Sequence, residues 1–404
     1  MTGFSPFIAL RYNTSRFTPE EVTSPPYDVL SAKDREDLVA RSEFNAVIVD
    51  LPLESDGEGR YAQAGKTLDA WLNDGVLVAD DTPQLTAYRM TTLDDLGKTV
   101  ATLGVIGALE LSRPGEGQIL PHEHTTPKAK SDRLDLLRGT ATNLSAIWGL
   151  SLTHGLSDLI DVSRDPDQAW RDEEDTLHEV WRISDSSQIE AICAAIGQTP
   201  IVVADGHHRY ETSLAYRDEQ RESAQGDTPG AEATLCYVVE LSEEQLTVRP
   251  IHRLVSGVEV DDLGAALGAL DGSTVVGKVS AEDVASGDVL REMDDKAAIA
   301  VVGPDGSAVL VHLDPQAYSG VDDLDSARLV AALEAIGPYE LTYQHGTALA
   351  QKAVTDGTSP WAVLIRPVTV AAIEANAHTG DRMPPKSTFF FPKPRTGIVF
   401  RPLS

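Results

Sequence analysis

The sequence predicts a globular protein of the α/β (α+β) class with more than one domain. Its 404 residues are 42% hydrophobic, a length and composition that suit two or three domains with substantial cores. The stretch TPIVVADGHHRYETSLAYR (199–217) has the pattern of a buried strand, a tight turn and a helix. Residues 258–313 alternate Ala-rich helical patterns with short Val-rich strand patterns, which predicts a second α/β module.

The formal net charge of −30 argues against a general nucleic-acid-binding protein, because affinity for backbone phosphates comes mainly from Lys and Arg. Positive charge gathers in three islands, at 127–138, 207–209 and 382–401, as a site for an anionic ligand requires. No apolar run approaches the length of a membrane span, and the N-terminus lacks a signal-peptide pattern. We therefore expect a cytoplasmic protein without membrane partners, in which Cys193 and Cys236 are buried thiols. The oligomeric state is left open.

The N-terminal region is predicted to present two polar side chains. The adjacent prolines of PPYD (25–28) force extended backbone, so that Tyr27 and Asp28 are held rigidly, although an ordinary stiff turn has the same pattern. The sequence next predicts a helix at 31–41, capped by its first serine, and a strand at 46–50.

A second dense cluster of chemical groups lies in HEHTTPKAKSDR (122–133). It favours a basic, carboxylate-bearing loop that folds over an anionic ligand. The side chains that carry this interpretation are His122, Glu123, His124 and Lys128. Ser131 or Asp132 is predicted to cap a helix that reaches Thr140. A merely polar loop before a helix cap is one alternative, and a zinc site built on the two histidines is another.

Two later segments carry less chemistry. Residues 165–172, 176–183 and 186–196 are predicted to form a helix, a strand and a helix with an acidic, solvated face. The segment PIHRL (250–254) contains His252, which suits a structural role and a ligand contact equally well.

The junction within 199–217 is the strongest candidate for a binding site. A helix that begins directly after a strand exposes unpaired N–H groups and the positive end of its dipole to an anion. Arg209 adds a planar fork of donors, and Gly206 allows a ligand close to the backbone. The alternative is that Asp205 only caps the helix and that the two following histidines are solvated or lie in the core.

The C-terminal stretch GDRMPPKSTFFFPK (380–393) joins cations, hydroxyls and aromatic rings. Lys386, Ser387 and Thr388 are candidates to complete a phosphate pocket from far along the sequence. An edge strand held by prolines, with its lysines in solvent, is the alternative.

The string ADGHHRYE (204–211) resembles the hallmark of a bacterial family known as domain of unknown function 1015. Other recurring elements of that family have counterparts along most of the chain. They are PPYDV (25–29), HEHT with PKAKSDR (122–133), NLSAIWGL (143–150), PIHRL (250–254) and MPPKST (383–388). The GHHR core also resembles the nucleotide-phosphate box of the ParB/sulfiredoxin superfamily, which includes chromosome-partitioning proteins, sulfiredoxins and free L-serine kinases. His207 stands where sulfiredoxins have a reactive cysteine, so thiol chemistry is not expected.

This resemblance implies a ParB/sulfiredoxin-like, nucleotide- or phosphate-binding core at 1–255 with an insertion at about 80–195, and a C-terminal α/β module at 256–404 whose tail returns to the site. It implies a small-molecule kinase that transfers a phosphoryl group from ATP, ADP or pyrophosphate, with Mg²⁺, to the hydroxyl of free L-serine, giving O-phosphoserine. A non-catalytic nucleotide-binding regulatory protein and a metal-dependent phosphohydrolase are the alternatives.

The same resemblance suggests a role for each candidate residue. Residues expected to bind the donor phosphates are Gly206, His207, His208, Arg209, His122, His124, Lys128, Lys386, Ser387 and Thr388. Candidates for catalysis are Asp205, Glu123, His207 and His208, with Glu20 and Glu21 as further carboxylates and Asp205 as the metal ligand. Residues expected to contact the substrate are Tyr27, Asp28 and Glu211. We also expect 122–133 and 386–388 to lie within roughly 10 Å of Asp205, about one Debye length.

Overall fold

The computed structural model describes residues 2–53, 59–94, 97–113, 115–121, 127–223, 229–379 and 386–403. The chain divides into two compact units. Unit 1 consists of Met1–Thr92, Thr99–Thr247 and Pro392–Ser404, and unit 2 of Leu93–Lys98 and Val248–Phe391. Unit 1 is therefore assembled from segments on both sides of unit 2 in the sequence. In the described part of the chain, no helix combines the length and apolar character needed to cross a membrane.

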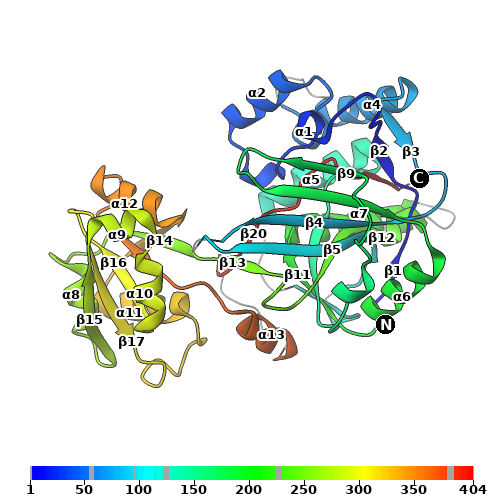
Figure 1. Ribbon diagram of the computed structural model, residues 1–404. Coiled ribbons are helices and arrows are strands. Elements are labelled where there is room, and N and C mark those ends of the chain that lie inside the picture. Colours follow the sequence, from blue (N-terminus) through cyan, green and yellow to red (C-terminus); the bar gives the residue numbers. More distant parts are fainter. Residues whose placement is uncertain are drawn as a thin grey trace. The chain divides into compact units, whose positions relative to one another are not determined.

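Unit 1 is built around a nine-stranded mixed sheet (Figure 1). Its strands are β1 (Phe4–Ser5), β4 (Leu85–Leu93), β5 (Thr99–Glu110), β6 (Ile119–Pro121), β8 (Ile147–Ser151), β9 (Gln168–Arg171), β10 (Leu177–Ile183), β11 (Ile201–Asp205) and β12 (Ala233–Glu240). They follow the order β6-β11-β8-β12-β5-β4-β10-β9, and β1 pairs with β5. β11 pairs parallel with β6 and antiparallel with β8, so it lies inside the sheet. Its first four residues are buried, as its apolar sequence predicts.

Helices and two short ribbons complete unit 1. The helices are α1 (Pro19–Val22), α2 (Ala32–Arg41), α3 (Val47–Asp50), α4 (Arg60–Asn73), α5 (Pro127–Thr140), α6 (Ser186–Ile196) and α7 (His207–Ser223). The ribbons pair β2 (Leu10–Tyr12) with β3 (Leu77–Ala79), and β7 (Thr142–Asn143) with β21 (Arg401–Pro402). One core cluster joins the sheet to α6 and to Tyr210 of α7, and a second joins α4, α5 and β2 to Phe400. Leu10 and Phe400 exchange two backbone hydrogen bonds of 2.9 Å, which fix the C-terminal segment in unit 1.

Unit 2 contains a six-stranded sheet in the order β15-β17-β16-β19-β14-β18. These strands are β14 (Ile251–Ser256), β15 (Ser273–Val279), β16 (Ala298–Val302), β17 (Ala308–Leu313), β18 (Glu340–His345) and β19 (Trp361–Leu364). The other elements are β13 (Thr247–Arg249), β20 (Phe389–Phe391), α8 (Leu263–Gly268), α9 (Ala281–Ser286), α10 (Val289–Asp295), α11 (Asp325–Ile336), α12 (Thr347–Thr355) and α13 (Val370–Thr379). Alternate residues of β16 pack into separate cores, Ala300 with α9, α10 and α12, and Val301 with α8 and α11. Helices therefore cover both faces of this sheet.

The strand, turn and helix predicted at 199–217 are confirmed as β11, Gly206 and α7. The helix predicted at 31–41 is confirmed as α2, and Ser31 forms a capping box with Asp34. The prediction that Ser131 or Asp132 caps a helix is wrong, because α5 begins earlier, at Pro127. The fixed φ of proline suits the first turn of a helix.

Two predictions of secondary structure are wrong. The strand predicted at 46–50 is the short helix α3, where the side chain of Asn45 accepts a hydrogen bond from the Val47 amide and donates to the carbonyls of Glu21 and Thr23. A short buried apolar run has no periodicity that distinguishes the two structures. The prediction of a helix at 165–172 is also wrong. This segment contains the edge strand β9, which pairs antiparallel with β10 and buries Trp170.

Candidate phosphate-binding site

The turn between β11 and α7 depends on Gly206. Its φ of +87° lies in the left-handed region that favours glycine. A Cβ atom at this position would lie 3.0 Å from Nε of Arg209. Glycine therefore allows the Arg209 side chain to fold back over the turn, toward Asp205 at the end of β11.

Asp205 lies between two cationic side chains. Its Oδ2 accepts a hydrogen bond of 2.7 Å from Arg209, and its Oδ1 accepts one of 2.6 Å from Lys393. Lys393 Nζ also lies 3.3 Å from Oδ2 of Asp28. Burial alone would raise the pKa of Asp205, but Lys393 and Arg209 outweigh it and lower that pKa to about 2. The carboxylate is therefore ionised at neutral pH and holds both cations in place.

A second buried ion pair joins α3 to α5. Arg133 donates to the backbone carbonyl of Asp50 at 2.7 Å and lies 3.4 Å from its Oδ1. The guanidinium carbon of Arg133 lies 4.0 Å from the centre of the Tyr27 ring, a cation–π contact. Burial raises the pKa of Asp50 above its ordinary value, although Arg133 and Arg209 oppose this shift. The same charges act on Tyr27, so the two ion pairs belong to one electrostatic cluster.

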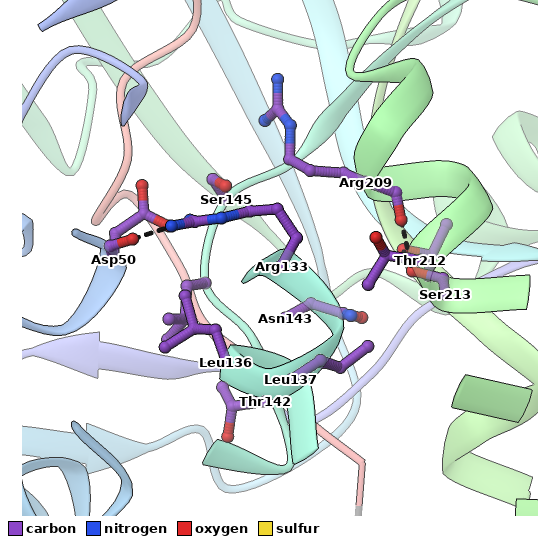
Figure 2. Close-up of a pocket in the computed structure, with 12 residues that line it drawn as sticks. Asp50, Arg133, Leu136, Leu137, Thr142, Asn143, Ser145, Arg209, Thr212 and Ser213 are labelled. Atoms are coloured by element: carbon purple, nitrogen blue, oxygen red, sulfur yellow. Dashed lines mark hydrogen bonds and ion pairs between the residues drawn. The ribbon is translucent and has the colours of Figure 1, made fainter. Parts of the chain in front are cut away.

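A cavity of about 50 Å³ opens between α5 and α7. Figure 2 shows Arg133 reaching from α5 toward Asp50 on one side of the cavity, with Arg209, Thr212 and Ser213 of α7 on the other. The Ser213 hydroxyl donates to the Arg209 carbonyl at 2.9 Å and lies 2.9 Å from the Thr234 hydroxyl. The hydroxyl of Thr212 and Nε of Arg209 are buried, and neither has a hydrogen-bond partner within the described ranges. Two arginines and the Thr212 hydroxyl thus line the cavity together with Asp50, the partner of Arg133.

The comparisons with known proteins begin with a family model described as "Protein of unknown function (DUF1015)", which matches residues 4–327. The chain is a member of the DUF1015 family. This match confirms the family resemblance of the string ADGHHRYE (204–211) and of the other sequence blocks up to residue 254, whereas MPPKST (383–388) lies outside the matched residues. A comparison with curated protein sequences found no match.

Solved structures similar to this DUF1015 protein include a mutant free serine kinase in complex with ADP, with 12% identity, coverage of 68% of this chain and 84% of that chain, and a TM-score of 0.35. A conserved hypothetical protein from Pyrococcus furiosus is 12% identical; the match covers 70% of this chain and 90% of that protein, with a TM-score of 0.35. C-terminally truncated SbnI from Staphylococcus aureus is 14% identical; the match covers 70% of this chain and 82% of SbnI, with a TM-score of 0.33. These TM-scores are below 0.5, so the function proposed below is based on the residues of the site.

The structure places some of the predicted site residues in one cluster of unit 1. Tyr27, Asp28, Asp205 and Arg209 interact there, and His207 lies near enough to lower the pKa of Asp205 further. His207 is buried in the first turn of α7, whereas His208 and Glu211 are half-buried on the same helix. Asp205 does not cap α7, because Gly206 separates it from the first helical residue.

Other predicted site residues lie elsewhere. His122, Glu123 and His124 are outside the described residues, and Lys128 lies in α5. Lys386, Ser387 and Thr388 belong to unit 2, so their predicted proximity to Asp205 stays a prediction. Glu21 accepts hydrogen bonds from its own helix cap, Thr18. Glu20 lines a small pocket of about 80 Å³ with Arg41, Asp172, Glu173, Trp170 and Arg395.

Sequence reasoning missed three residues of the cluster, Asp50, Arg133 and Lys393. Arg133 and Lys393 lie within two of the islands of positive charge, 127–138 and 382–401, but no local pattern distinguishes them from their neighbours. Asp50 was part of a predicted strand, so its carboxylate had no expected partner.

No group of three or more His, Cys, Asp or Glu side chains suited to a metal ion occurs among the residues that the structure describes. Each oxygen of Asp205 accepts a hydrogen bond from a cationic side chain. Asp28 differs, because its side chain is 38% exposed and only its Oδ2 lies near Lys393. One carboxylate with accessible oxygens suffices for Mg²⁺ that phosphates and water molecules also hold.

Proposed function

We propose that this DUF1015 protein is a small-molecule phosphotransferase whose phosphate site is the cluster around Asp205. The observation that carries the proposal is the convergence of Arg133, Arg209 and Lys393, from three distant parts of a chain with a net charge of −30. Phosphoryl transfer requires mainly positioning and stabilisation of charge, which fixed cations at a helix N-terminus supply.

The proposed phosphoryl donor is ATP, ADP or pyrophosphate, bound by Gly206, His207, His208 and Arg209 at the start of α7. Arg133, Arg209 and Thr212 line the adjoining cavity and are the proposed contacts of a donor phosphate there. Asp205 keeps Arg209 and Lys393 in position for the donor. Its low pKa makes it a weak proton acceptor, so it is better suited to positioning than to general base catalysis.

Mg²⁺ is the proposed metal, and Asp28 fits it better than Asp205 does. Asp132 also pairs with Arg133, at 3.0 Å. The formal charges of Arg133, Arg209 and Lys393 are thus fully balanced by Asp28, Asp50, Asp132 and Asp205, and a polyphosphate donor needs further positive charge. The helix dipole supplies part of it, and the ring N–H groups of His207 and His208 add hydrogen-bond donors. When bound, Mg²⁺ would supply the remainder by neutralising charge on the transferred group. In this proposal the metal role expected for Asp205 passes to Asp28.

The proposed acceptor is the hydroxyl of free L-serine, and the product is O-phosphoserine. This specificity rests on the resemblance of GHHR (206–209) to the box of free L-serine kinases, as does a ParB/sulfiredoxin-like core within 1–255. The cytoplasmic location expected from the sequence belongs to the same proposal. Glu123 remains the candidate base, with Tyr27, Asp28 and Glu211 near the substrate. The base takes the serine hydroxyl proton as the oxygen attacks the terminal phosphorus of the donor and the leaving phosphate departs.

The deciding experiment screens ATP, ADP and pyrophosphate with Mg²⁺ against free L-serine and follows O-phosphoserine by ³¹P NMR. We expect one donor to give O-phosphoserine at a rate that Arg209→Ala and His208→Ala strongly reduce while the chain remains folded. Donor binding without turnover would favour a regulatory protein instead. Phosphate release that does not depend on serine would favour a phosphohydrolase.

A further inference from the structure

Unit 2 contains a cavity of about 280 Å³ that the proposed function does not use. The residues of its wall that carry chemistry are Arg249, His252, Ser286, His345, Thr347 and Phe389. No Asp or Glu occurs among the described residues that line it. The chain contains 63 acidic residues, so a wall whose described residues include an arginine, two histidines and two hydroxyls but no carboxylate favours an anionic ligand.

His252 lines this cavity and carries a ring N–H group. Its side chain is buried, with 1% of the residue exposed. Burial, together with Arg253 and His345, lowers its pKa to about 3, so the ring is neutral at physiological pH. Nδ1 accepts a hydrogen bond of 3.3 Å from the backbone amide of Ile365, which assigns the ring proton to Nε2. Within the described part of the chain, His252 makes no other hydrogen bond, and the ring that carries this N–H lines the cavity.

The start of α12 lies in the same wall. Gly346 directly precedes the helix, at the N-cap position, and has a φ of +77°. Glycine has no side chain, so the N-cap residue does not cap the first amides of α12. A Cβ atom at Gly346 would meet nothing within 4 Å, so the approach to these amides is open. Thr347, the first helical residue, adds its hydroxyl to the wall. Helix amides and a neutral imidazole N–H together form a site for an oxyanion.

Aromatic side chains support the charged and apolar parts of the wall. The guanidinium carbon of Arg249 lies 3.4 Å from the centre of the Phe391 ring, an arrangement that fixes the plane of the side chain. The rings of His345 and Phe389 lie 4.1 Å apart between their centres. Phe389 and Leu290 are apolar residues of the same cavity wall.

We propose that this cavity binds a small organic phosphate, a phosphomonoester whose phosphate group meets Arg249, His252 and the first amides of α12. A dianionic tetrahedral group can accept from an arginine fork, an imidazole N–H, a hydroxyl and backbone amides at once. The volume leaves room for a small organic group against Phe389. All of these residues belong to unit 2, so this site shares no residue with the proposed phosphotransferase site.

The test is calorimetric titration of the full chain with phenyl phosphate, in the wild-type protein and in Arg209→Ala, which weakens the site of unit 1. We expect saturable binding in both proteins. Arg249→Gln should weaken it at least tenfold and Thr347→Val by a smaller factor. Lys352→Gln, which removes an exposed cation farther along α12, should leave it unchanged.

Circular dichroism and thermal unfolding establish that each variant is folded. Phenylacetate and inorganic phosphate are titrated in parallel. Binding of phenylacetate as tight as that of phenyl phosphate would overturn the assignment to phosphates. The site itself would be refuted if phenyl phosphate does not bind, or if the folded Arg249→Gln protein binds it normally.

Discussion

The ammonium group of Lys393 lies 2.6 Å from Oδ1 of Asp205, although 188 residues separate the two in the sequence. Their side chains are only 13% and 18% exposed, and Arg209 contacts the other oxygen of the same carboxylate. A carboxylate between two mostly buried cations holds all three side chains, because displacing the carboxylate leaves two cations without it, and displacing either cation leaves one carboxylate oxygen without its charged partner. The C-terminal segment is thereby connected to the start of α7.

Replacement of Lys393 by methionine tests this connection. Lys393→Met leaves Asp205 with one cation, and we expect it to lower the free energy of unfolding by about 3 kcal/mol, the usual cost of breaking a buried pair. Chemical denaturation measures the change. Lys352→Met, which removes an exposed lysine paired with Asp356, is the control and should change stability by less than about 0.5 kcal/mol. Equal effects of the two substitutions would contradict the structural role of Lys393.

Arg209→Lys keeps the charge but loses the planar fork. The Arg209 side chain bonds the carboxylate of Asp205 and, at 2.5 Å, the carbonyl of Ala146, which one ammonium group is less suited to do. We expect donor affinity, measured by calorimetry with pyrophosphate and ADP, to fall by about 1.5–3 kcal/mol. Arg221→Lys, at an exposed position of the same helix, should retain normal affinity.

Thr212 and Ser213 allow a test of whether the cavity in Figure 2 binds phosphate. Because the Thr212 hydroxyl has no hydrogen-bond partner among the described residues, Thr212→Val should leave the stability of the ligand-free protein unchanged or raise it by about 1 kcal/mol. The same variant should bind phosphate more weakly. Ser213→Ala removes two hydrogen bonds and should instead lower stability by about 1–2 kcal/mol. Normal phosphate affinity in Thr212→Val would place the anion elsewhere.

Substitutions of Glu123, Asp205 and Asp28 are expected to have different kinetic effects, because we propose a different role for each carboxylate. Glu123→Gln should lower turnover about 10²-fold with donor affinity largely kept, as expected of a general base. Asp205→Asn should impair donor binding and turnover together, because Arg209 and Lys393 lose their shared partner. Asp28→Asn should raise the Mg²⁺ concentration needed for half-maximal donor binding. Asp37→Asn, at an exposed position of α2, is the control for charge alone. Full turnover in Glu123→Gln would pass the role of general base to another carboxylate, with Glu20 and Glu21 next in line.

The pH dependence of stability follows from the pKa of Asp205. Its value of about 2 in the folded protein lies below its ordinary value of 3.8, so ionised Asp205 stabilises the fold above about pH 4. That stabilisation is lost as pH falls from about 4 to 2 and amounts to roughly 2 kcal/mol. Denaturant unfolding of the wild-type protein and of Asp205→Asn should therefore converge over this pH range. A constant difference between the two proteins would show that Asp205 is not held by its neighbours.

Local patterns in the sequence predicted the junction of β11 and α7 because each part has its own chemistry. An apolar run, a glycine and an amphipathic segment suffice to place Asp205 beside Arg209. The family resemblance, confirmed by the match over residues 4–327, added the candidates Tyr27 and Asp28.

The partners of these residues could not be predicted, because tertiary packing alone brings them together. Nothing near Lys393 in the sequence indicates that it will contact Asp205, and nothing near Arg133 indicates a partner at Asp50. Residues 46–50 were assigned as a strand since the local hydrogen bonds of Asn45, which favour a helix, do not appear in a pattern of apolar side chains.

The placement of residues 392–404 in unit 1 also determines when the site can form during synthesis. A chain emerging from the ribosome exposes its N-terminal segments first. Asp28, Asp205 and Arg209 are therefore available long before Lys393, and all of residues 248–391 must be translated in between. A nascent or prematurely terminated chain that lacks Lys393 would have an incomplete site, so the phosphate affinity of the site in unit 1 should appear only after translation has passed that residue.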